Sequence, residues 1–494
     1  MATVQEWMQG VVREDEIERY LNNGCDFIND ALFERLLAET KFDPARVRES
    51  IAKAEGLARL ELAEAAALIA IPPEHELWQD VFAAAGRIKE SVYGNRVVTF
   101  APLYISNHCV NACLYCGYRQ ENDAITRKRL TDEEIIAETE ALARAGHKRL
   151  VLVFGEHPDS DYVFIARAMK LVYGVQVGNG NIRRTNINAA PLPIDALRML
   201  RDVGIGTYQV FQETYNRESY TDAHASARID ASINARPKAH YRWRLYAMHR
   251  AMEAGVDDVG LGVLFGLSDW KFELLGLLAH TIDLEKRFGG VGPHTISFPR
   301  IEPAINTPYT KAAPHRVDDE TFARAVAVIR LMVPYTGMIV TAREDLAMRD
   351  RLLDTGITQL DLGSNIGVGK YSQDKEDHAH QQFVLSDTRS LEDGIRWLAS
   401  RGRITSFCTA DYRLGRTGRE FMCIAKKGNI QHMCRPNAVL TFKEYLLDYA
   451  SPETRTLGEA IITRELAGIA PGQVKTRTLE YLARIEAGER DLYL

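Results

Sequence analysis

The feature that most constrains the fold is a regular alternation of β-rich runs with helical segments between residues 97 and 402. The β-rich runs cover residues 97–106, 149–156, 184–189, 206–214, 257–266, 294–303, 337–344 and 357–364. The second run, RLVLVFGE, is almost continuously apolar, which is typical of a parallel strand that is covered on both faces. Eight strand-then-helix units predict an α/β fold with a closed (β/α)8 barrel of the TIM type, and an open doubly wound sheet is the alternative.

The flanks of this region read as helical. In residues 1–82 the apolar positions recur at helical spacing, with a break at Pro72 and Pro73. Thr131 and Glu134 form the capping box of the first barrel helix, and Gly146 stands where a helix C-terminal glycine belongs. We therefore expect an N-terminal helical extension (1–82), the barrel (83–402) and a C-terminal helical tail (403–494).

Composition excludes several classes of protein. The net charge of −6 gives no reason to expect a nucleic-acid or membrane-surface partner. No apolar run approaches the roughly 20 residues of a membrane span. The first residues, MATVQEWMQGVVREDE, lack the regions of a signal peptide, so we expect a cytoplasmic protein. Seven cysteines in 494 residues make a disulfide scaffold a poor interpretation.

Three of these cysteines lie directly after the first predicted strand. Cys109, Cys113 and Cys116 follow the pattern C-x3-C-x2-C. Active sites of (β/α)8 barrels lie at this end of the strands. Three thiolates with one open position fit an iron–sulfur cluster that has one accessible iron. The alternative is a zinc site that takes His108 as its fourth ligand.

The spacing of this loop, with Tyr115 before the last cysteine, resembles the radical S-adenosylmethionine (SAM) superfamily. The resemblance implies that the three cysteines hold a 4Fe–4S cluster whose fourth iron chelates SAM. Reductive cleavage of SAM then yields a 5′-deoxyadenosyl radical that abstracts hydrogen. Other stretches resemble the SAM-binding segments of the superfamily, at Tyr115, Gly155, Glu156, Gln212, Glu213, Thr214 and 260–266. Among these, Glu156 would hold the SAM amino group, a charge-assisted contact.

Longer stretches, including YISNHCVNACLYCGYR, VGPHTISFPRIEPA and SFCTADYRLGRTGREFM, resemble the HydG family of tyrosine lyases. That family matures FeFe-hydrogenase and is related to the thiazole-pathway lyase ThiH. Both cleave the Cα–Cβ bond of L-tyrosine to p-cresol and dehydroglycine, and HydG makes CO and cyanide at a second cluster in its tail. The resemblance also implies an electron donor such as flavodoxin or ferredoxin, and hydrogenase maturation proteins as partners.

The same resemblance assigns roles to residues at the ends of other strands. Tyr104 and Ser106 would line the tyrosine pocket. Thr341 and Arg343 would hold the substrate carboxylate, for which the planar fork of arginine is well suited. His294 would bind an extra iron of the tail cluster. Tyr104, Ser106, Thr341 and Arg343 would thus form one substrate site at the C-terminal ends of the strands.

The tail departs from the HydG pattern, which has C-x2-C-x22-C. Here Cys408 and Cys434 keep their spacing, but the middle ligand is Asp411. Asp411 could ligate a cluster as a harder ligand, Cys423 could replace the missing thiolate, or the cluster could be absent with Asp411 capping a helix. The stretch LDLGSNIGVGKYS (360–372) also departs from the pattern, around Asp361, Leu362 and Asn365.

The departures leave three functions open. The first is HydG-like tyrosine cleavage, with CO and cyanide for hydrogenase maturation. The second is an aromatic amino-acid lyase of another pathway, which makes neither product and stops nearer to dehydroglycine. The third is a non-catalytic Fe–S scaffold, against which Glu156 and Arg343 argue, since a scaffold needs neither residue.

Overall fold

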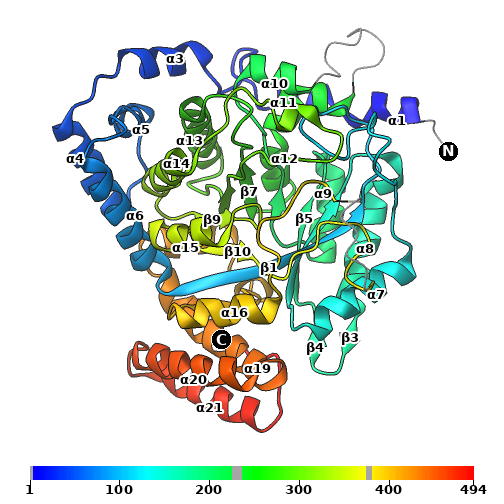
Figure 1. The fold of residues 1–494 in the computed structure, drawn as a ribbon, viewed down its shortest axis with the longest axis vertical. Coiled ribbons are helices and arrows are strands. Elements are labelled where there is room, and N and C mark those ends of the chain that lie inside the picture. Colours follow the sequence, from blue (N-terminus) through cyan, green and yellow to red (C-terminus); the bar gives the residue numbers. More distant parts are fainter. Residues whose placement is uncertain (1–3, 225–235, 374–380) are drawn as a thin grey trace.

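The computed structural model describes residues 4–224, 236–373 and 381–494, and its centre is a closed barrel of eight parallel strands (Figure 1). The strands are β1 (Arg96–Ser106), β2 (Arg149–Phe154), β5 (Arg184–Asn188), β6 (Tyr208–Gln209), β7 (Val259–Gly262), β8 (Thr295–Ser297), β9 (Gly337–Val340) and β10 (Gln359–Asp361). β10 pairs with β1 through Val98 and Gln359, which closes the barrel. The prediction of a closed (β/α)8 barrel is confirmed, and the open sheet is wrong.

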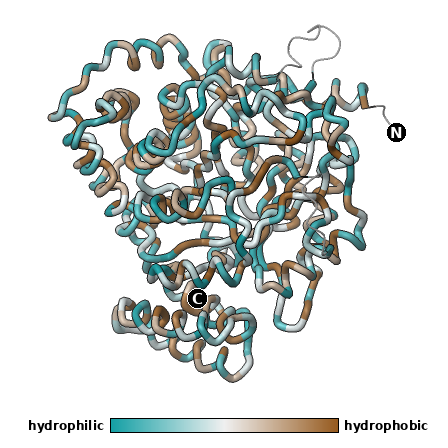
Figure 2. Tube along the Cα trace, in the orientation of Figure 1, coloured by the Kyte–Doolittle hydropathy of each residue, from teal (hydrophilic) through white to brown (hydrophobic). Residues whose placement is uncertain are grey.

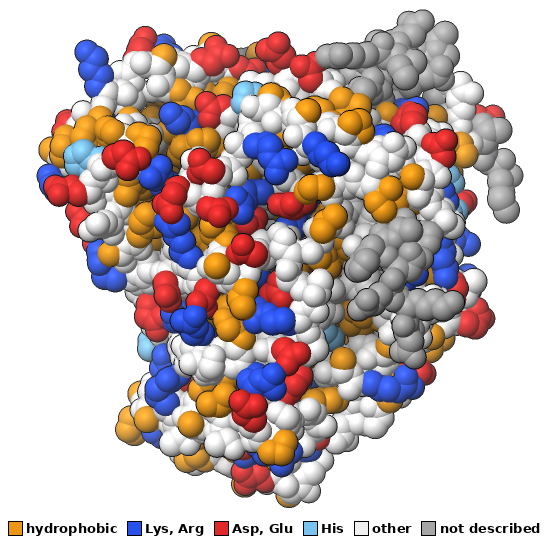
Figure 3. All heavy atoms as spheres, viewed as in Figure 1, with side chains coloured by type: hydrophobic (Ala, Val, Ile, Leu, Met, Phe, Trp, Pro, Cys, Tyr) orange, Lys and Arg blue, Asp and Glu red, His pale blue; other side chains and the backbone are white. Residues whose placement is uncertain are grey.

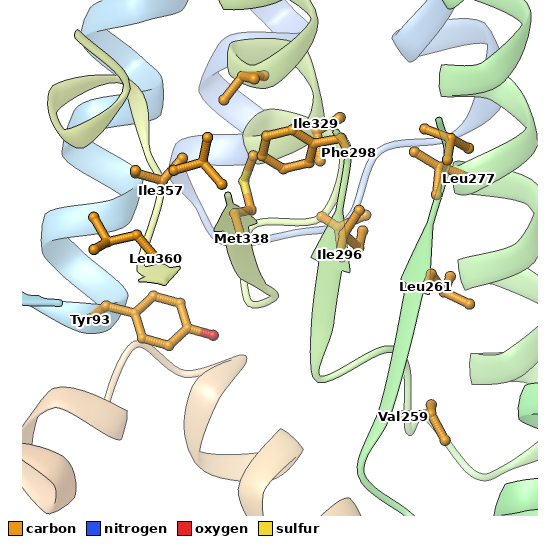
Figure 4. Packing of buried hydrophobic residues seen from close by; sticks show 14 of the residues in the cluster. Tyr93, Val259, Leu261, Leu277, Ile296, Phe298, Ile329, Met338, Ile357 and Leu360 are labelled. Atoms are coloured by element: carbon orange, nitrogen blue, oxygen red, sulfur yellow. The ribbon is translucent and has the colours of Figure 1, made fainter. Parts of the chain in front are cut away.

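Helices surround the barrel. They are α7 (Asp132–Arg144), α8 (Tyr162–Gly174), α9 (Ile194–Val203), α10 (Arg217–Ala223), α11 (Tyr241–Leu245), α12 (Ala247–Glu253), α13 (Trp270–Arg287), α14 (Asp319–Met332), α15 (Leu346–Thr355) and α16 (Leu391–Ser400). Figure 4 shows Leu261 and Ile296 of the strands beside Leu277 and Ile329 of the helices, and all are buried. The predicted capping box of Thr131 and Glu134 is present at the start of α7. A small antiparallel hairpin, β3 (Gln176–Val177) and β4 (Gly180–Asn181), extends from the barrel.

Side chains inside the barrel form layers along its axis. Strand residues two apart point to the same face, so the pattern in each strand sets which side chain belongs to which layer. Phe100, Val151 and Ile339 form a small apolar cluster of their own, separate from the main core between strands and helices. Arg96 and Arg149 lie at the first residue of their strands, below this apolar layer. The apolar layer therefore separates two polar ends of the barrel.

The N-terminal extension is helical, as predicted. Its elements are α1 (Val4–Val11), α2 (Glu14–Glu18), α3 (Asp30–Glu39), α4 (Pro44–Glu55), α5 (Leu62–Ile69) and α6 (Leu77–Tyr93). Pro72 and Pro73 fall between α5 and α6, where a proline pair is expected to end a helix. α6 runs through residue 82 into the barrel region and packs against α14. Figure 1 shows α3 to α6 in blue along one flank of the barrel, and α1 on the opposite side.

The C-terminal tail lies at the end of the barrel where β1 begins (Figure 1). Its elements are β11 (Ile404–Ser406), α17 (Ala410–Arg413), α18 (Gly418–Ala425), α19 (Ile430–Asp448), α20 (Pro452–Ala467) and α21 (Gln473–Glu486). The sequence predicted helices here but not β11, which pairs in parallel with the start of β1. The tail thus continues the sheet before it becomes helical.

The outer surface is mixed in character. Hydrophobic and hydrophilic segments alternate along the helices (Figure 2), as expected for helices with one buried face. Acidic and basic side chains are interspersed on the face in Figure 3. Among the described residues, no helix combines the length and the apolar character that crossing a membrane requires.

Candidate functional site

The three cysteines meet in one cavity at the C-terminal ends of the strands. Cys109, Cys113 and Cys116 are free thiols in the loop after β1, and all three line a cavity of about 230 Å³. Burial raises the pKa of Cys109, and it raises the pKa of Cys113 to about 12 although Lys238 opposes it. A metal that binds here must displace protons, as is usual for thiolate sites. Three converging soft ligands fit an iron–sulfur cluster.

Gly155 and Glu156 hold this loop against the end of β2. A Cβ atom on Gly155 would lie 2.2 Å from the backbone oxygen of His108, so only glycine permits this approach. The Gly155 N–H donates to the backbone oxygen of Ser106 at 2.9 Å, and the Val110 N–H donates to that of Glu156 at 2.9 Å. The glycine therefore positions both the cysteine loop and the carboxylate that follows.

The Glu156 carboxylate has one oxygen available to a ligand. Oε2 accepts a hydrogen bond from Asn111 Nδ2 at 2.6 Å, while Oε1 is buried and has no partner among the described residues. Burial raises the pKa of Glu156, and the residue lines the cavity. Since a buried polar atom normally has a partner, Oε1 fits a ligand that carries an ammonium group.

Glu213 forms a charged cluster on the wall beside Tyr115. Its Oε1 lies 2.9 Å from Lys238 Nζ and 2.9 Å from Arg244 Nη2. Burial alone would raise the pKa of Glu213, but the two cations outweigh it and lower the pKa to about 2. Glu213 has a φ of 72°, an unusual conformation for a residue other than glycine, which marks a constrained site. The predicted residue Glu213 lines the cavity, and the sequence missed its two partners.

Three other predicted residues are not among those that line the cavity. The amide of Gln212 is buried without a partner among the described residues, and its backbone N–H donates to Gly262. Thr214 Oγ1 donates to Glu273 instead. Ser106 is fully buried and receives the His108 N–H on its Oγ at 3.3 Å. These three side chains therefore do not form part of the cavity surface.

Thr341 and Arg343 come from the segment after β9 and line the same cavity. The guanidinium of Arg343 stacks on Phe383 at 3.5 Å from the ring centroid, and Nη1 donates to the backbone oxygen of Arg300. Within the described residues no carboxylate lies within 4.0 Å of Arg343, and Thr341 Oγ1 has no hydrogen-bond partner. A stacked arginine without a counter-ion beside a free hydroxyl fits an anionic ligand.

Tyr104 lies between the cysteines and the arginine. Its hydroxyl donates to Gln382 Oε1 at 2.9 Å, and Gln382 Nε2 donates to Cys116 Sγ at 3.4 Å. The carboxylate of Asp361 also lines the cavity, and its Oδ1 lies 3.6 Å from Arg349 Nη2. In the sequence, Asp361 stands out only as a departure from the HydG pattern. Gln382 could not be predicted, because its loop has no periodic pattern.

The tail residues Cys408, Asp411 and Cys434 line a second, small cavity together with Arg96. Cys434 Sγ lies 3.2 Å from Asp411 Oδ2, and Asp411 Oδ1 accepts from Arg416 at 2.9 Å. Asp411 lies inside the first turn of α17, whose N-cap residue is Thr409, so it does not cap that helix.

Cys423 is exposed on α18 and is not among the residues that line this second cavity. The structure therefore groups Asp411, and not Cys423, with the two buried tail cysteines.

Three buried arginines lie at this end of the barrel, and one of them, Arg96, lines the tail cavity. Arg96, Arg149 and Arg184 are at most 6% exposed. Nε and Nη1 of both Arg96 and Arg149 have no hydrogen-bond partner among the described residues. Arg184 pairs with Asp258 at 2.7 Å and lies 3.5 Å from Cys408 Sγ. Buried cations need compensation, so this end of the barrel fits an anionic occupant.

His294 lies at this same end, before β8. Its Nδ1 is 3.6 Å from Asp258 Oδ2, and its ring packs on Phe421 of α18 at 4.2 Å between centroids. Burial lowers the pKa of His294 to about 4, so the ring is neutral, as a metal ligand must be. The sequence missed the arginines, although each of the first three strands (RVVTF, RLVLV, RTNIN) begins with one.

Comparison with known proteins gives consistent matches. The profile of the radical SAM superfamily matches residues 103–277, and that of the biotin and thiamin synthesis associated domain matches 297–404. The 2-iminoacetate synthase of Salmonella typhimurium is 27% identical over 352 residues, which are 70% of this chain and 87% of that protein.

Two solved structures match over nearly the whole chain. HydG, a maturase of the FeFe-hydrogenase, is 45% identical with a TM-score of 0.89, covering 95% of this chain and 100% of that one. HydG from Carboxydothermus hydrogenoformans is 35% identical with a TM-score of 0.77, covering 95% and 99% of the two chains.

Proposed function

Because this chain belongs to the HydG family of the radical SAM superfamily, we propose that it cleaves the Cα–Cβ bond of L-tyrosine to p-cresol and dehydroglycine. Membership of the superfamily implies a 4Fe–4S cluster and SAM as cofactors. When bound, they supply the hydrogen-abstracting radical chemistry of the superfamily. An electron donor such as a flavodoxin or ferredoxin is part of this proposal.

One observation carries the proposal. A free carboxylate oxygen on Glu156 and an arginine without a counter-ion, Arg343, line the same cavity as the three cysteines. The first suits the ammonium group of SAM, and the second suits the carboxylate of an amino-acid substrate. A scaffold protein has no use for either group.

Each residue then has a defined task. Cys109, Cys113 and Cys116 would hold the cluster. Thr341 and Arg343 would orient the substrate carboxylate, which places the amine and the Cα–Cβ bond toward the cluster end. Phe100, Val151 and Ile339 of the apolar layer line the same cavity and would limit the access of water to the reacting groups from that side.

A second cluster in the tail is the finer part of the proposal. Cys408, Asp411 and Cys434 would be its ligands, and His294 would bind an additional iron. The Nε and Nη1 atoms of Arg96 and Arg149, which have no hydrogen-bond partner among the described residues, support an occupant of net negative charge. With that cluster, dehydroglycine would be converted to CO and cyanide for hydrogenase maturation.

The aspartate at position 411 also favours a second candidate function. A carboxylate is a harder ligand than a thiolate, so it holds iron less firmly in a soft cluster. If the tail held no cluster, the chain would be an aromatic amino-acid lyase that ends at dehydroglycine.

The test is an anaerobic assay of the reconstituted protein with SAM, dithionite and L-tyrosine. We expect p-cresol and 5′-deoxyadenosine in comparable amounts, and CO and cyanide if the tail cluster is present. p-Cresol without CO supports the second candidate. Deoxyadenosine formed only with a different amino acid would refute tyrosine as the substrate.

The role of Asp411 can be tested by iron analysis. We expect about eight irons or more per chain in the reconstituted protein, and about four after Asp411→Ala, since each cubane holds four. Asp411→Cys should keep the full iron content and lose it more slowly to a chelator, because thiolate is the softer ligand. The exposed Cys423→Ser variant is the control and should match the parent protein. Unchanged iron in Asp411→Ala would show that the carboxylate is not a ligand.

A further inference from the structure

We propose that His108, His157 and Asp159 bind one divalent cation of the borderline class, such as Zn²⁺, Ni²⁺, Co²⁺ or Fe²⁺. Potential ligand atoms of the three residues lie within 4.8 Å of one another. No task in the proposed reaction uses any of these three side chains. The site would lie on the outer side of the two loops that carry Cys109 and Glu156.

The fold brings the three residues together for a specific reason. β1 and β2 are parallel neighbours, and their last residues, Ser106 and Phe154, are paired. His108 follows the first strand, and His157 and Asp159 follow the second. The close approach of Gly155 to the His108 backbone then brings the two loops into contact. Residues far apart in the sequence therefore meet at fixed positions.

Neighbouring side chains divide between the two sides of these loops. Cys109 and Glu156 line the cavity, whereas their neighbours His108 and His157 do not. The two imidazole rings lie with centroids 5.3 Å apart in an edge-on arrangement. His108 is 27% and His157 is 21% exposed, so water and ions can reach them. The cation site is thus separate from the site of the three cysteines.

The atomic contacts are those of a site that lacks a positive charge. Asp159 Oδ2 lies 3.1 Å from His108 Nδ1 and 3.3 Å from His157 Nδ1. His157 Nδ1 also accepts the backbone N–H of Asp159 at 3.1 Å, so Nδ1 is unprotonated and a cation bound to it would replace that hydrogen bond. His157 Nδ1 and Asp159 Oδ2 are both acceptors 3.3 Å apart, and a cation that takes the His157 lone pair would offset their repulsion.

No other cation compensates the carboxylate. Arg129 is nearby, but its Nη1 donates to the backbone oxygen of Asp159, and its guanidinium lies 4.6 Å over the Phe164 ring. Among the described residues no lysine or arginine lies within 4.0 Å of the Asp159 carboxylate. Two imidazoles and one carboxylate are a donor set for Zn²⁺ or Fe²⁺ with open positions for water.

The cation would join the loop of Cys109 to the loop of Glu156. It would also add one metal ion per chain to a total metal analysis, and one iron per chain where the cation is Fe²⁺.

The test uses the reconstituted holoenzyme, in which the cysteines are already occupied by iron. We expect isothermal titration with Zn²⁺ to show one site per chain, with no loss of cluster iron. Asp159→Asn and His157→Ala should each weaken Zn²⁺ binding by at least about tenfold, since each removes one of three ligands. His315→Ala, which removes an exposed histidine elsewhere, should leave the affinity unchanged.

The outcomes separate the proposal from nonspecific binding and from the lyase function. Equal affinity and stoichiometry in the parent protein and both variants, or no binding at all, would overturn the proposal. Because the readout is Zn²⁺ binding and not product formation, it remains valid if tyrosine is not the substrate. Asp159→Asn changes a half-exposed side chain and keeps its shape, so its fold is expected to survive.

Discussion

Replacing Cys116 with serine is expected to lower 5′-deoxyadenosine formation by on the order of 10³-fold or more, because a hard hydroxyl replaces one of three soft ligands. Cys116 is the thiol that two donors already orient, the Gln382 amide and the Tyr118 N–H, both at 3.4 Å from its sulfur. The measurement is deoxyadenosine formation together with the iron content and the visible absorbance of the cluster.

The controls for this variant are two cysteines outside both cavities. Cys25 and Cys423 are exposed, so Cys25→Ser and Cys423→Ser should keep both the absorbance and the deoxyadenosine rate. If Cys116→Ser kept its barrel cluster and its rate, the assignment of the loop to cluster binding would be wrong. If Cys423→Ser lost iron, Cys423 and not Asp411 would be the third tail ligand.

The barrel could be predicted because the alternation of apolar runs and helices is a property of the sequence itself. The residues at which individual strands end could not be predicted in this way. The run 206–214 looked like one long strand, yet β6 covers only Tyr208–Gln209. Beyond β6 the run keeps only an isolated parallel bridge between Glu213 and Val263, and Glu213 has a positive φ and pairs with Lys238 and Arg244, contacts that β propensity does not encode.

The candidate site was predictable to the extent that it follows from the barrel. Cys109, Glu156 and Arg343 follow three different strands, and parallel strands in a barrel bring such positions together. Contacts that depend on loops, such as Gln382 with Tyr104, leave no periodic trace in the sequence. The tail cavity could be predicted from the spacing of Cys408 and Cys434. The buried arginines near it could not, because their position depends on which strand residues point into the barrel.

The second large effect is expected at Arg343. We expect Arg343→Met to lower p-cresol formation at limiting tyrosine by between about 30-fold and about 4,000-fold, which corresponds to the roughly 2–5 kcal/mol lost when one partner of a buried charge pair is removed. Arg343→Lys should recover only part of this loss, because a lysine keeps the charge but cannot form the bidentate contact or stack on Phe383 in the same way.

The control distinguishes loss of substrate binding from loss of the fold. Arg351 is a more exposed arginine that pairs with Glu320, so Arg351→Met should leave p-cresol formation close to the parent rate. SAM affinity and cluster content should be unchanged in Arg343→Met, because the proposed function assigns Arg343 to the substrate and Glu156 to SAM. A parallel loss of SAM binding would place Arg343 in the cofactor site, and an unchanged rate would exclude it from the substrate site. Comparing the affinity for tyrosine with the affinity for SAM therefore tests whether Arg343 and Glu156, which line one cavity, bind two different ligands.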